Sequence, residues 1–585
     1  MDVEKLLRQG LQHHQAGRLD KAGEAYQQVL KSDPDNADAL NLMGVILQAA
    51  GNLDAAITLI TRATDLVPDF VPPFVNLGNA LQEACRFDDA VDAFRKAIEL
   101  APDQAEAVNN LSSALNKLEH FDEALEASER AIELTPGLCP AHMNLGNALA
   151  GLGRTVEAVE SYKRALEIDP TDSAAYYNLG NVYTEMENLK AALEQFRKAL
   201  EFDTENAEKY YNYANTALAL DLYEDATAGY RRALEIVPGY IDAQCNLGTV
   251  LLKMGRSDEA VASLRRAIVD EPKSPDLHWN LALALLQAGD YKDGWAEYEW
   301  RWQMPTFEAF QRDFGVPLWQ GEDLDGRTLF IDTEQGFGDS IMFARYAPIA
   351  AERGGRVVLE CRPQLNSLFA SLNGVNEVVD LGHPPGHFDF YAPLMSLPHI
   401  LGTTAETIPT DVPYVKPPEE TPVDSRIAEA PGVKVGFAWA GSPTRIDNVK
   451  RSCDIALFEP LIALPGLNFF SLQVGEFQEQ LRDLDTARLV IDLADDFRDF
   501  ADTAAAVQAL DLVISVDTAV LHLAGALAKP AWGLMSQPTG FLWQDQRKDS
   551  PWYPTLRLFR QPEHGEWAPV FEQVKRELNE MMAKS

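Results

Sequence analysis

The stretch Asp511–Pro530, DLVISVDTAVLHLAGALAKP, decides the fold of the C-terminal half of this chain. Its apolar start, Leu512–Ile514, is typical of a buried strand, and a polar turn follows at Ser515–Thr518. The next residues, Ala519–Ala528, predict an almost wholly apolar helix that Pro530 ends. A strand, a polar turn and a buried helix form an α/β unit, and ligand crevices in such folds lie at the carboxyl ends of the strands.

Two side chains of this stretch are candidates for a chemical role in addition to packing. Asp517 stands where a helix N-cap belongs, and the free N–H groups of a helix N-terminus suit a phosphate. His522 lies four residues after Thr518, so the two share one helix face. The alternative interpretation is that Asp517 only caps the helix and that His522 is a hydrogen-bonded core histidine. Residues elsewhere in the chain are needed to choose between these two interpretations.

Length and composition narrow the class of protein. With 585 residues we expect three or four domains. A net charge of −39 argues against nucleic acid or an anionic membrane surface as a partner. The polar N-terminus lacks the apolar core of a signal peptide, and no apolar run approaches membrane-spanning length. The five cysteines lack metal-like spacing: Cys85, Cys139, Cys245, Cys361 and Cys453. We therefore expect a cytoplasmic protein without a membrane segment, disulfides or a bound metal.

A 34-residue period organises the N-terminal half. Prolines recur at this interval, with Thr204 in one slot: Pro34, Pro68, Pro102, Pro136, Pro170, Pro238 and Pro272. An alanine stands twelve residues before each slot: Ala22, Ala56, Ala90, Ala124, Ala158, Ala192, Ala226 and Ala260. Large side chains follow four residues later in most repeats: Tyr26, Phe94, Tyr162, Phe196 and Tyr230. Small residues recur where two helices would approach closely: Gly44, Gly78, Gly146, Gly180, Ala214 and Gly248. This pattern resembles the tetratricopeptide repeat, with eight full copies and a degenerate ninth over Lys273–Trp302.

Stacked helix pairs of this kind form an α-solenoid, here a tetratricopeptide superhelix with a concave groove. One asparagine recurs in the first helix of seven successive repeats: Asn76, Asn110, Asn144, Asn178, Asn212, Asn246 and Asn280. A second follows three residues on in four of them: Asn79, Asn147, Asn181 and Asn215. A carboxamide can pair with both the N–H and the C=O of an extended peptide, so we expect these residues to bind an acceptor polypeptide by its backbone. The alternative is that they serve packing between repeats. The array resembles the repeat domain of O-GlcNAc transferases, in which such asparagines hold protein substrates.

The repeat pattern decays over Gly289–Trp302, where three tryptophans stand within eight positions. We expect these rings to cap the solenoid and dock it on the next domain rather than to bind a ligand. From residue 327 strand-like and helix-like segments alternate twice, which predicts two parallel sheets with helices on their faces. The expected strands are Thr328–Thr333, Val357–Cys361, Val375–Leu381, Val433–Ala440, Leu467–Val474, Leu489–Leu493, the run at 512–514 and Ala531–Met535. The expected helices of this half are Ser340–Arg353, Leu365–Leu372, one beginning at Leu457, and Thr503–Leu510.

The predicted domain boundaries follow from these changes in pattern. They are 1–304 for the tetratricopeptide superhelix, 305–326 for a connector, 327–420 for an N-terminal Rossmann-like lobe, 421–432 for a linker, and 433–585 for a C-terminal Rossmann-like lobe with a nucleotide-sugar site and a C-terminal helix. Two such lobes in series are the plan of the GT-B fold of glycosyltransferases, as an analogy of fold alone.

The second half resembles the family 9, heptosyltransferase-like glycosyltransferases, in the subfamily fused to tetratricopeptide repeats. The segments that carry the resemblance are Glu334–Asp339 (EQGFGD), Gly436–Ser442 (GFAWAGS), Lys450–Ser452, Asp502–Ala504, Val516–Pro530 and Asp549–Pro554 (DSPWYP). The resemblance implies a GT-B glycosyltransferase that uses a nucleotide-sugar co-substrate and no other cofactor, and that inverts the configuration of the anomeric carbon. The sequence lacks an Asp-x-Asp triad at a strand end, so we expect no metal in the reaction.

By this resemblance Asp339 is the general base that takes the proton of the acceptor hydroxyl. Gly338 would let the ligand approach the backbone closely, and the lack of a third glycine disfavours a dinucleotide site. The loop Ala438–Ser442 would offer its N–H groups, including that of Gly441, and the Ser442 hydroxyl to a phosphate. Lys450 and Arg451 would supply the positive charge that an acidic protein needs at a nucleotide-sugar site.

The opening stretch is similar to the Asp-Thr-Gly-x-x-His motif of heptosyltransferases, with Ala519 in place of the glycine. The likeness implies that Thr518 and the N–H groups of Ala519 and Val520 meet the donor phosphate, that Asp517 meets sugar hydroxyls, and that His522 orients the donor. Three nearby aromatic residues either line the site or pack in the core: Trp543, Trp552 and Tyr553.

We therefore expect a protein glycosyltransferase whose repeats capture an acceptor polypeptide. Its layout resembles that of bacterial flagellin glycosyltransferases, which implies flagellin as the acceptor. One alternative is a lipopolysaccharide or small-glycan glycosyltransferase that uses its repeats for assembly. A second alternative is a repeat adaptor with an inactive transferase domain.

Overall fold

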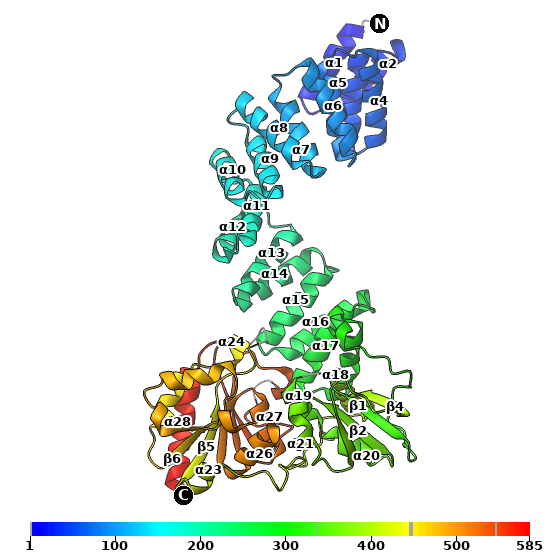
Figure 1. Ribbon diagram of the computed structural model, residues 1–585. Helices are drawn as coiled ribbons and strands as arrows, with labels where there is room; N and C mark the ends of the chain where they lie inside the picture. Colours follow the sequence, from blue (N-terminus) through cyan, green and yellow to red (C-terminus); the bar gives the residue numbers. More distant parts are fainter. Residues whose placement is uncertain (1–2, 335, 444–447, 545–546, 585) are drawn as a thin grey trace. The chain divides into compact units, whose positions relative to one another are not determined.

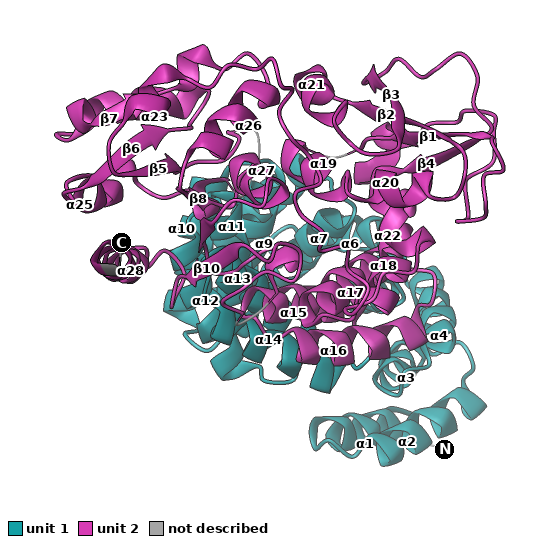
Figure 2. Cartoon of the chain, turned by 90° about the horizontal axis from the view of Figure 1, so that it is seen from below, with its two compact units in different colours: residues 1–238 teal, residues 239–585 magenta. Residues whose placement is uncertain are grey.

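The computed structural model describes residues 3–334, 336–443, 448–544 and 547–584. The chain forms two compact units, residues 1–238 and residues 239–585 (Figure 2). The last two helix pairs of the repeat pattern thus belong to the same unit as the α/β part of the chain.

The described part of the first unit is a row of antiparallel helix pairs (Figure 1). Its helices are α1 (Val3–Gln15), α2 (Leu19–Ser32), α3 (Ala37–Ala49), α4 (Leu53–Leu66), α5 (Val71–Glu83), α6 (Phe87–Leu100), α7 (Ala105–Lys117), α8 (Phe121–Leu134), α9 (Cys139–Gly151), α10 (Thr155–Ile168), α11 (Ser173–Glu185), α12 (Leu189–Phe202), α13 (Ala207–Ala219) and α14 (Tyr223–Ile236). The two helices of a pair pack together, and each pair packs on the next along the chain. The predicted α-solenoid is therefore confirmed for this part of the chain.

Small residues set the distance between the helices of a pair. A methyl group added at Gly78 would lie 2.4 Å from the ring of Phe94, and one at Gly146 would lie 2.5 Å from the ring of Tyr162. The eight alanines of the repeat are all fully buried, as a residue at a close helix crossing must be. The period in the sequence therefore has a direct cause, since only a small side chain leaves room for the aromatic side chain of its partner helix.

The second unit begins with two further helix pairs and two 3₁₀ segments. Their bounds are α15 (Ile241–Lys253), α16 (Ser257–Asp270), α17 (Pro275–Ala288), α18 (Tyr291–Tyr298), η1 (Glu299–Gln303) and η2 (Pro305–Phe310). Gly289 ends α17 in the left-handed region with a φ of 89°, a position that glycine occupies without strain.

The first sheet is parallel, with the strand order β3-β2-β1-β4. Its strands are β1 (Thr328–Asp332), β2 (Arg356–Cys361), β3 (Val375–Asp380) and β4 (Phe390–Pro393), and the helices between and after them are α19 (Phe337–Phe343), α20 (Tyr346–Ala351), α21 (Asn366–Phe369) and α22 (Leu397–Ile400). The strand β4 is absent from our prediction because it is only four residues long and ends in a proline.

The helix predicted over Ser340–Arg353 is wrong as a single element. The structure has two short helices, α19 and α20, separated at Ala344 and Arg345. Pro348 has no N–H to donate to the carbonyl of Ala344, and its ring would clash with that carbonyl in a continuous helix. The helix therefore breaks before the proline. The next predicted helix, Leu365–Leu372, is likewise reduced to the single turn of α21.

The second sheet is also parallel, with the strand order β10-β9-β8-β5-β6-β7. Its strands are β5 (Val433–Ala438), β6 (Leu467–Ser471), β7 (Val490–Asp492), β8 (Leu512–Val516), β9 (Ala531–Met535) and β10 (Leu556–Arg560), and its helices include α24 (Asn448–Arg451), α25 (Glu459–Ile462), α26 (Phe500–Ala509), α27 (Ala519–Ala526) and α28 (Ala568–Lys584). Our prediction omitted β10. Residues 421–432, which we expected to be a plain linker, contain the short helix α23 (Ser425–Glu429).

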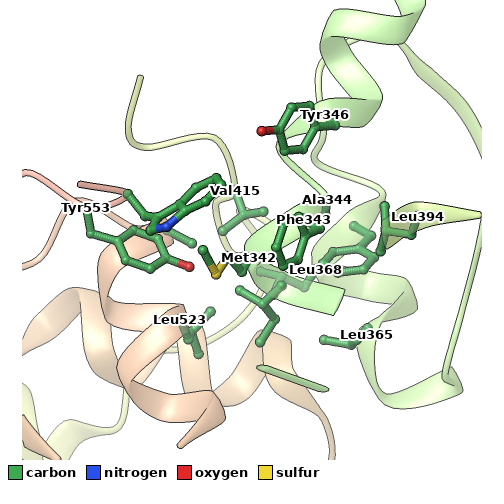
Figure 3. Packing of buried hydrophobic residues seen from close by; sticks show 14 of the residues in the cluster. Met342, Phe343, Ala344, Tyr346, Leu365, Leu368, Leu394, Val415, Leu523 and Tyr553 are labelled. Carbon is green, nitrogen blue, oxygen red and sulfur yellow. The ribbon is translucent and has the colours of Figure 1, made fainter. Parts of the chain in front are cut away.

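One continuous apolar core joins the three parts of the second unit. It contains Trp295 and Tyr298 of α18, Phe343 of the first sheet's helices, and Leu523 of α27. Figure 3 shows Met342, Phe343 and Val415 with Leu523 and Tyr553 in this core. A second core lies on the other face of the second sheet, which α25 and α28 cover. The two sheets are therefore packed through α19 and α27.

Candidate functional site at the carboxyl ends of two sheets

The helices α19 and α27 bring the two sheets together. The helix α19 follows β1, and α27 follows β8, so each begins at the carboxyl edge of its sheet. A methyl group at Gly338 would lie 3.0 Å from Cδ2 of His522 and 3.8 Å from Cα of Ala519. Gly338 thus allows α27 to approach its backbone closely, and its predicted role toward a ligand stays a prediction.

Asp339 lies in the first turn of α19 and is partly exposed. The N-cap of α19 is Gly336, so Asp339 is not the cap of its helix. Burial raises the pKa of Tyr298 in α18, and the nearby charges of Glu334 and Asp339 raise it further against the opposing effect of Arg301. Gln335, in the same motif, is outside the described residues.

Asp517 does not cap α27, which corrects our prediction. The N-cap is Thr518, and its hydroxyl lies 2.8 Å from that of Ser515. Asp517 instead pairs with Arg451: a guanidinium nitrogen lies 2.5 Å from its carboxylate and donates to its carbonyl oxygen at 2.8 Å. Ala519 and Val520 begin the helix, so their N–H groups have no partner within it.

His522 is buried, and its ring lies among polar and aromatic groups. Its Nδ1 lies 3.2 Å from the hydroxyl of Tyr553, and its Nε2 lies 3.8 Å from the carboxylate of Asp517. Its ring stacks on Trp543 with 5.1 Å between the centroids. Burial lowers the pKa of His522 to about 4, although the charge of Asp517 acts in the opposite direction. A neutral imidazole with such a pKa is a poor proton acceptor at neutral pH, so His522 suits an orienting role.

The glycine-containing loop after β5 is different from our prediction. The N–H groups of Trp439 and Ala440 both donate to Oε1 of Gln473, at 3.1 and 2.9 Å. The N–H of Gly441 donates to the Ser452 hydroxyl at 3.3 Å. These backbone groups are therefore occupied within the protein. A methyl group at Gly441 would lie 2.7 Å from Oδ1 of Asn448, which explains the glycine by packing.

Of the three remaining predicted residues around this loop, two lie toward solvent and one does not. Ser442 is exposed just before residues 444–447, which are outside the described residues. Lys450 and Arg451 form the end of α24; the Lys450 side chain is exposed, and the Arg451 side chain is turned toward Asp517. Of the two cations, Arg451 is thus the one that the structure brings to α27.

Sequence reasoning missed Arg345, which joins the two sheets. It lies between α19 and α20, is buried, and donates to the carbonyl oxygens of Pro409 and Trp552 at 2.8 and 2.7 Å. Its guanidinium lies 4.5 Å from the ring centroid of Tyr553. The sequence held one signal for this role, because Arg345 is a single arginine among the apolar residues 341–351. An arginine in such a buried segment needs hydrogen-bonding partners, since an unpaired charge is rarely buried.

The aromatic residues near the site serve packing. Trp543, Trp552 and Tyr553 are almost fully buried, which decides between the two interpretations given above. Trp295 of α18 is also buried, with its ring edge-on to Phe343 at 5.5 Å. The prediction that the rings at the end of the repeats dock on the next part of the chain is confirmed for Trp295.

The recurrent asparagines of the first unit bond to the preceding repeat. The carboxamide nitrogens of Asn76, Asn110, Asn144 and Asn178 donate to side-chain oxygens of Asn41, Asn79, Asn109 and Asn147, at 2.9 to 3.0 Å. Asn212 donates to the hydroxyl of Tyr177 at 2.6 Å. All seven predicted peptide-binding asparagines are partly exposed. Packing between repeats thus uses an N–H of five of these seven amides.

Two grooves lie on the first unit, one repeat apart. Their volumes are about 370 and 330 Å³. Val108, Leu111 and Leu115 line the first, and the residues one repeat earlier, Phe74, Leu77 and Leu81, line the second. The repeat period therefore reproduces the same apolar hollow at successive positions.

Across 3–334, 336–443, 448–544 and 547–584, no helix has the length and apolar character needed to cross a membrane. In the same residues no three or more histidine, cysteine, aspartate or glutamate side chains are grouped as metal ligands.

Comparison with known families identifies the repeats. Residues 13–78, 75–138, 173–206 and 245–299 match families described as tetratricopeptide repeat, and residues 146–187 match one described as TPR repeat. Together with the helix pairs, these matches establish that the N-terminal half of the chain is built of tetratricopeptide repeats.

Individual relatives share smaller parts of the chain. Protein FlbA of Caulobacter vibrioides is 28% identical over 326 residues, which are 50% of this chain and 53% of that protein. The chain thus spans about half the length of this relative. A similar solved structure is that of MamA, which is 30% identical and matches over 28% of this chain and 96% of its own, with a TM-score of 0.26. YrrB, "a TPR protein with an unusual peptide-binding site", is 25% identical and matches over 34% of this chain and 99% of its own, with a TM-score of 0.29. A tetratricopeptide repeat protein from Parabacteroides merdae is 17% identical and matches over 43% of this chain and 98% of its own, with a TM-score of 0.36. None of these four similarities spans more than half of this chain.

Proposed function

We propose that this protein is a glycosyltransferase that transfers a sugar from a nucleotide-sugar donor to a hydroxyl group of a polypeptide. The observation that carries the proposal is the contact between Gly338 and His522. It places the turn with Asp339, at the carboxyl end of β1, beside the first turn of α27, at the carboxyl end of β8. Ligands of parallel α/β folds bind at such edges. Two parallel sheets that meet in this way support a GT-B arrangement.

In the proposed reaction Asp339 accepts the proton of the acceptor hydroxyl. The hydroxyl oxygen then forms a bond to the anomeric carbon while the bond from that carbon to the donor phosphate breaks. The displaced nucleotide phosphate carries the negative charge away. Attack from the face opposite the leaving group inverts the configuration of the anomeric carbon.

The donor phosphate is assigned to the N-terminus of α27 and to Arg451. Ala519 and Val520 offer N–H groups there, and the helix dipole favours an anion. Arg451 lies at this point because Asp517 holds its guanidinium. The exposed Lys450 and Ser442 belong to the same loop region and complete the proposed donor site. Neutral His522 positions Asp517 through its buried ring.

The repeats are assigned to the acceptor polypeptide. The seven carboxamides are partly exposed, and a carboxamide can pair with both the N–H and the C=O of a peptide: Asn76, Asn110, Asn144, Asn178, Asn212, Asn246 and Asn280. Because they recur once in each repeat, they suit a main chain rather than one particular side chain. By resemblance of layout the proposed acceptor is flagellin, in the cytoplasm.

The proposal is tested by incubating the purified full-length protein with a panel of nucleotide sugars and a bacterial lysate. The expected result is a protein acceptor whose intact mass rises by one sugar residue with one donor of the panel. Transfer to lipid or to a small glycan in place of protein would favour the lipopolysaccharide alternative. Absence of transfer from every donor, with retained capture of a polypeptide, would favour the adaptor alternative.

A further inference from the structure

Arg301 lies in η1, directly after the last repeat helix, and is fully buried. All five N–H donors of its guanidinium have acceptors. The Nε and one Nη2 hydrogen point to Oε1 of Glu334, at 3.1 and 2.9 Å. The remaining donors reach Glu299 at 2.7 Å, the carbonyl of Tyr298 at 3.3 Å and the hydroxyl of Ser396 at 2.7 Å. The guanidinium is therefore held in one orientation.

Two further observations fix this arrangement. The guanidinium lies 4.8 Å from the ring centroid of Tyr298 and 4.3 Å from that of Trp302. The Ser396 hydroxyl donates in turn to Glu299 at 2.9 Å, which closes a ring of hydrogen bonds. A planar, five-donor cation suits this site, and a lysine could satisfy only part of it.

Glu334 connects the hydrogen bonds of Arg301 to the candidate active site. It follows β1 by two residues and opens the turn to α19, and its side chain is only 1% exposed. Gly338, which adjoins Asp339 in the first turn of α19, is held by the contact with His522. Arg301 thus holds Glu334 before the start of α19, and α27 holds Gly338 beside Asp339.

We propose that Arg301 is a positioning residue for Asp339, through Glu334. The inference rests on the proposed function, in which Asp339 is the general base. It gives the last repeat helices a second role besides docking, because they fix the turn that bears the base. A small displacement of a catalytic group lowers kcat strongly, whereas the donor site on α27 and Arg451 is unaffected.

The test uses the full-length protein and the variant Arg301→Lys, with Arg356→Lys as the control. Arg356 forms an exposed pair with Glu377 in the same sheet, away from the turn. The first readout is amide hydrogen exchange in peptides that cover residues 329–343. In Arg301→Lys we expect exchange of the 334–340 amides to be faster by about tenfold or more, while peptides from α27 and α5 are unchanged. The control should match the wild type.

The second readout is steady-state transfer with the donor that the panel identifies. We expect kcat to fall by about tenfold or more in Arg301→Lys, with the KM for the donor changed by less than about threefold. Ser396→Ala removes one of the five hydrogen bonds of the guanidinium and should give a smaller change in the same direction in both readouts. It keeps the inference testable if Arg301→Lys does not fold.

The two readouts separate this inference from the proposed function. Hydrogen exchange of residues 334–340 that stays at the wild-type rate in both folded variants would overturn the positioning role. An unchanged kcat would overturn it as well. If the wild type transfers no sugar, the proposed function fails, and the hydrogen-exchange comparison still decides whether Arg301 holds the turn.

Discussion

Gly338 of α19 lies against His522 of α27, so close that a methyl group at position 338 would be 3.0 Å from the imidazole ring. The contact joins the first helix after β1 to the helix after β8, and it sets the position of Asp339 relative to Asp517. A substitution at either side of the contact should therefore disturb stability and activity together.

The variant Gly338→Ala tests this contact. Because His522 is buried and cannot move freely, we expect the free energy of unfolding to fall by about 1–3 kcal/mol. The matched control is Gly336→Ala, where the added methyl group would have its nearest neighbour, Oδ2 of Asp339, at 3.9 Å. Urea unfolding of both variants measures the difference, and equal stability would contradict the packing role of Gly338.

The buried His522 predicts a dependence of stability on pH. Its pKa is lowered to about 4 by burial, from an ordinary value of 6.5, so the unfolded chain takes up a proton first as the pH falls. The stabilising contribution is complete above pH 6.5 and is lost as the pH falls toward 4. Between about pH 7.5 and about pH 5 the loss amounts to about 2 kcal/mol.

His522→Gln is the variant that tests this dependence, with urea unfolding at both pH values as the measurement. The wild type should lose about 2 kcal/mol more than His522→Gln over this interval, since glutamine does not titrate. Parallel curves for the two proteins would show that the imidazole is not held neutral in the folded state.

Loss of the ion pair between Arg451 and Asp517 should also lower the free energy of unfolding. The side chains are 20% and 15% exposed, so Arg451→Met leaves a largely buried carboxylate without its cation. We expect a loss of about 2 kcal/mol in the free energy of unfolding, together with weaker donor binding. The control is Arg130→Met, which breaks a pair with Glu133 whose side chains are 52% and 66% exposed, and which should contribute less than about 1 kcal/mol. Equal losses in the two variants would argue against the buried pair.

Asn147 can be used to measure how much the recurrent asparagines contribute to stability. Its side-chain oxygen accepts from the carboxamide of Asn178 at 2.9 Å and from the hydroxyl of Tyr162 at 2.8 Å. Asn147→Ala leaves both donors without this acceptor, and we expect a loss of about 1–3 kcal/mol. Asn147→Asp keeps an acceptor and should recover most of the stability. The thermal unfolding of the two variants decides, and a neutral alanine variant would show that the amides serve only binding.

Sequence reasoning succeeded where a pattern is repeated. The 34-residue period predicted the helix pairs because each position recurs with the same packing demand, as at Gly78 and Gly146. Most strands of the two sheets were also found, since a buried parallel strand is a short, continuous apolar run. The strands β4 and β10 were missed because the first is very short and the second alternates apolar with arginine side chains.

The parts that sequence reasoning missed depend on contacts between distant segments. No local pattern shows that Gln473 bonds to the loop after β5, that Asp517 pairs with Arg451 instead of capping α27, or that Arg345 reaches the carbonyl of Trp552. These partners are 33, 66 and 207 residues apart in the chain. The residue types were visible in the sequence, but their partners were not.

The proposed role of Asp339 as the base of a sugar-transfer reaction is tested most directly by the rate at which the acceptor protein gains mass with Asp339→Asn. Asp325→Asn, which changes an 81% exposed carboxylate before β1, is the matched control. We expect Asp339→Asn to lower kcat by about a hundredfold or more and Asp325→Asn to leave it unchanged. Wild-type rates of transfer in the Asp339→Asn protein would show that Asp339 is not the base.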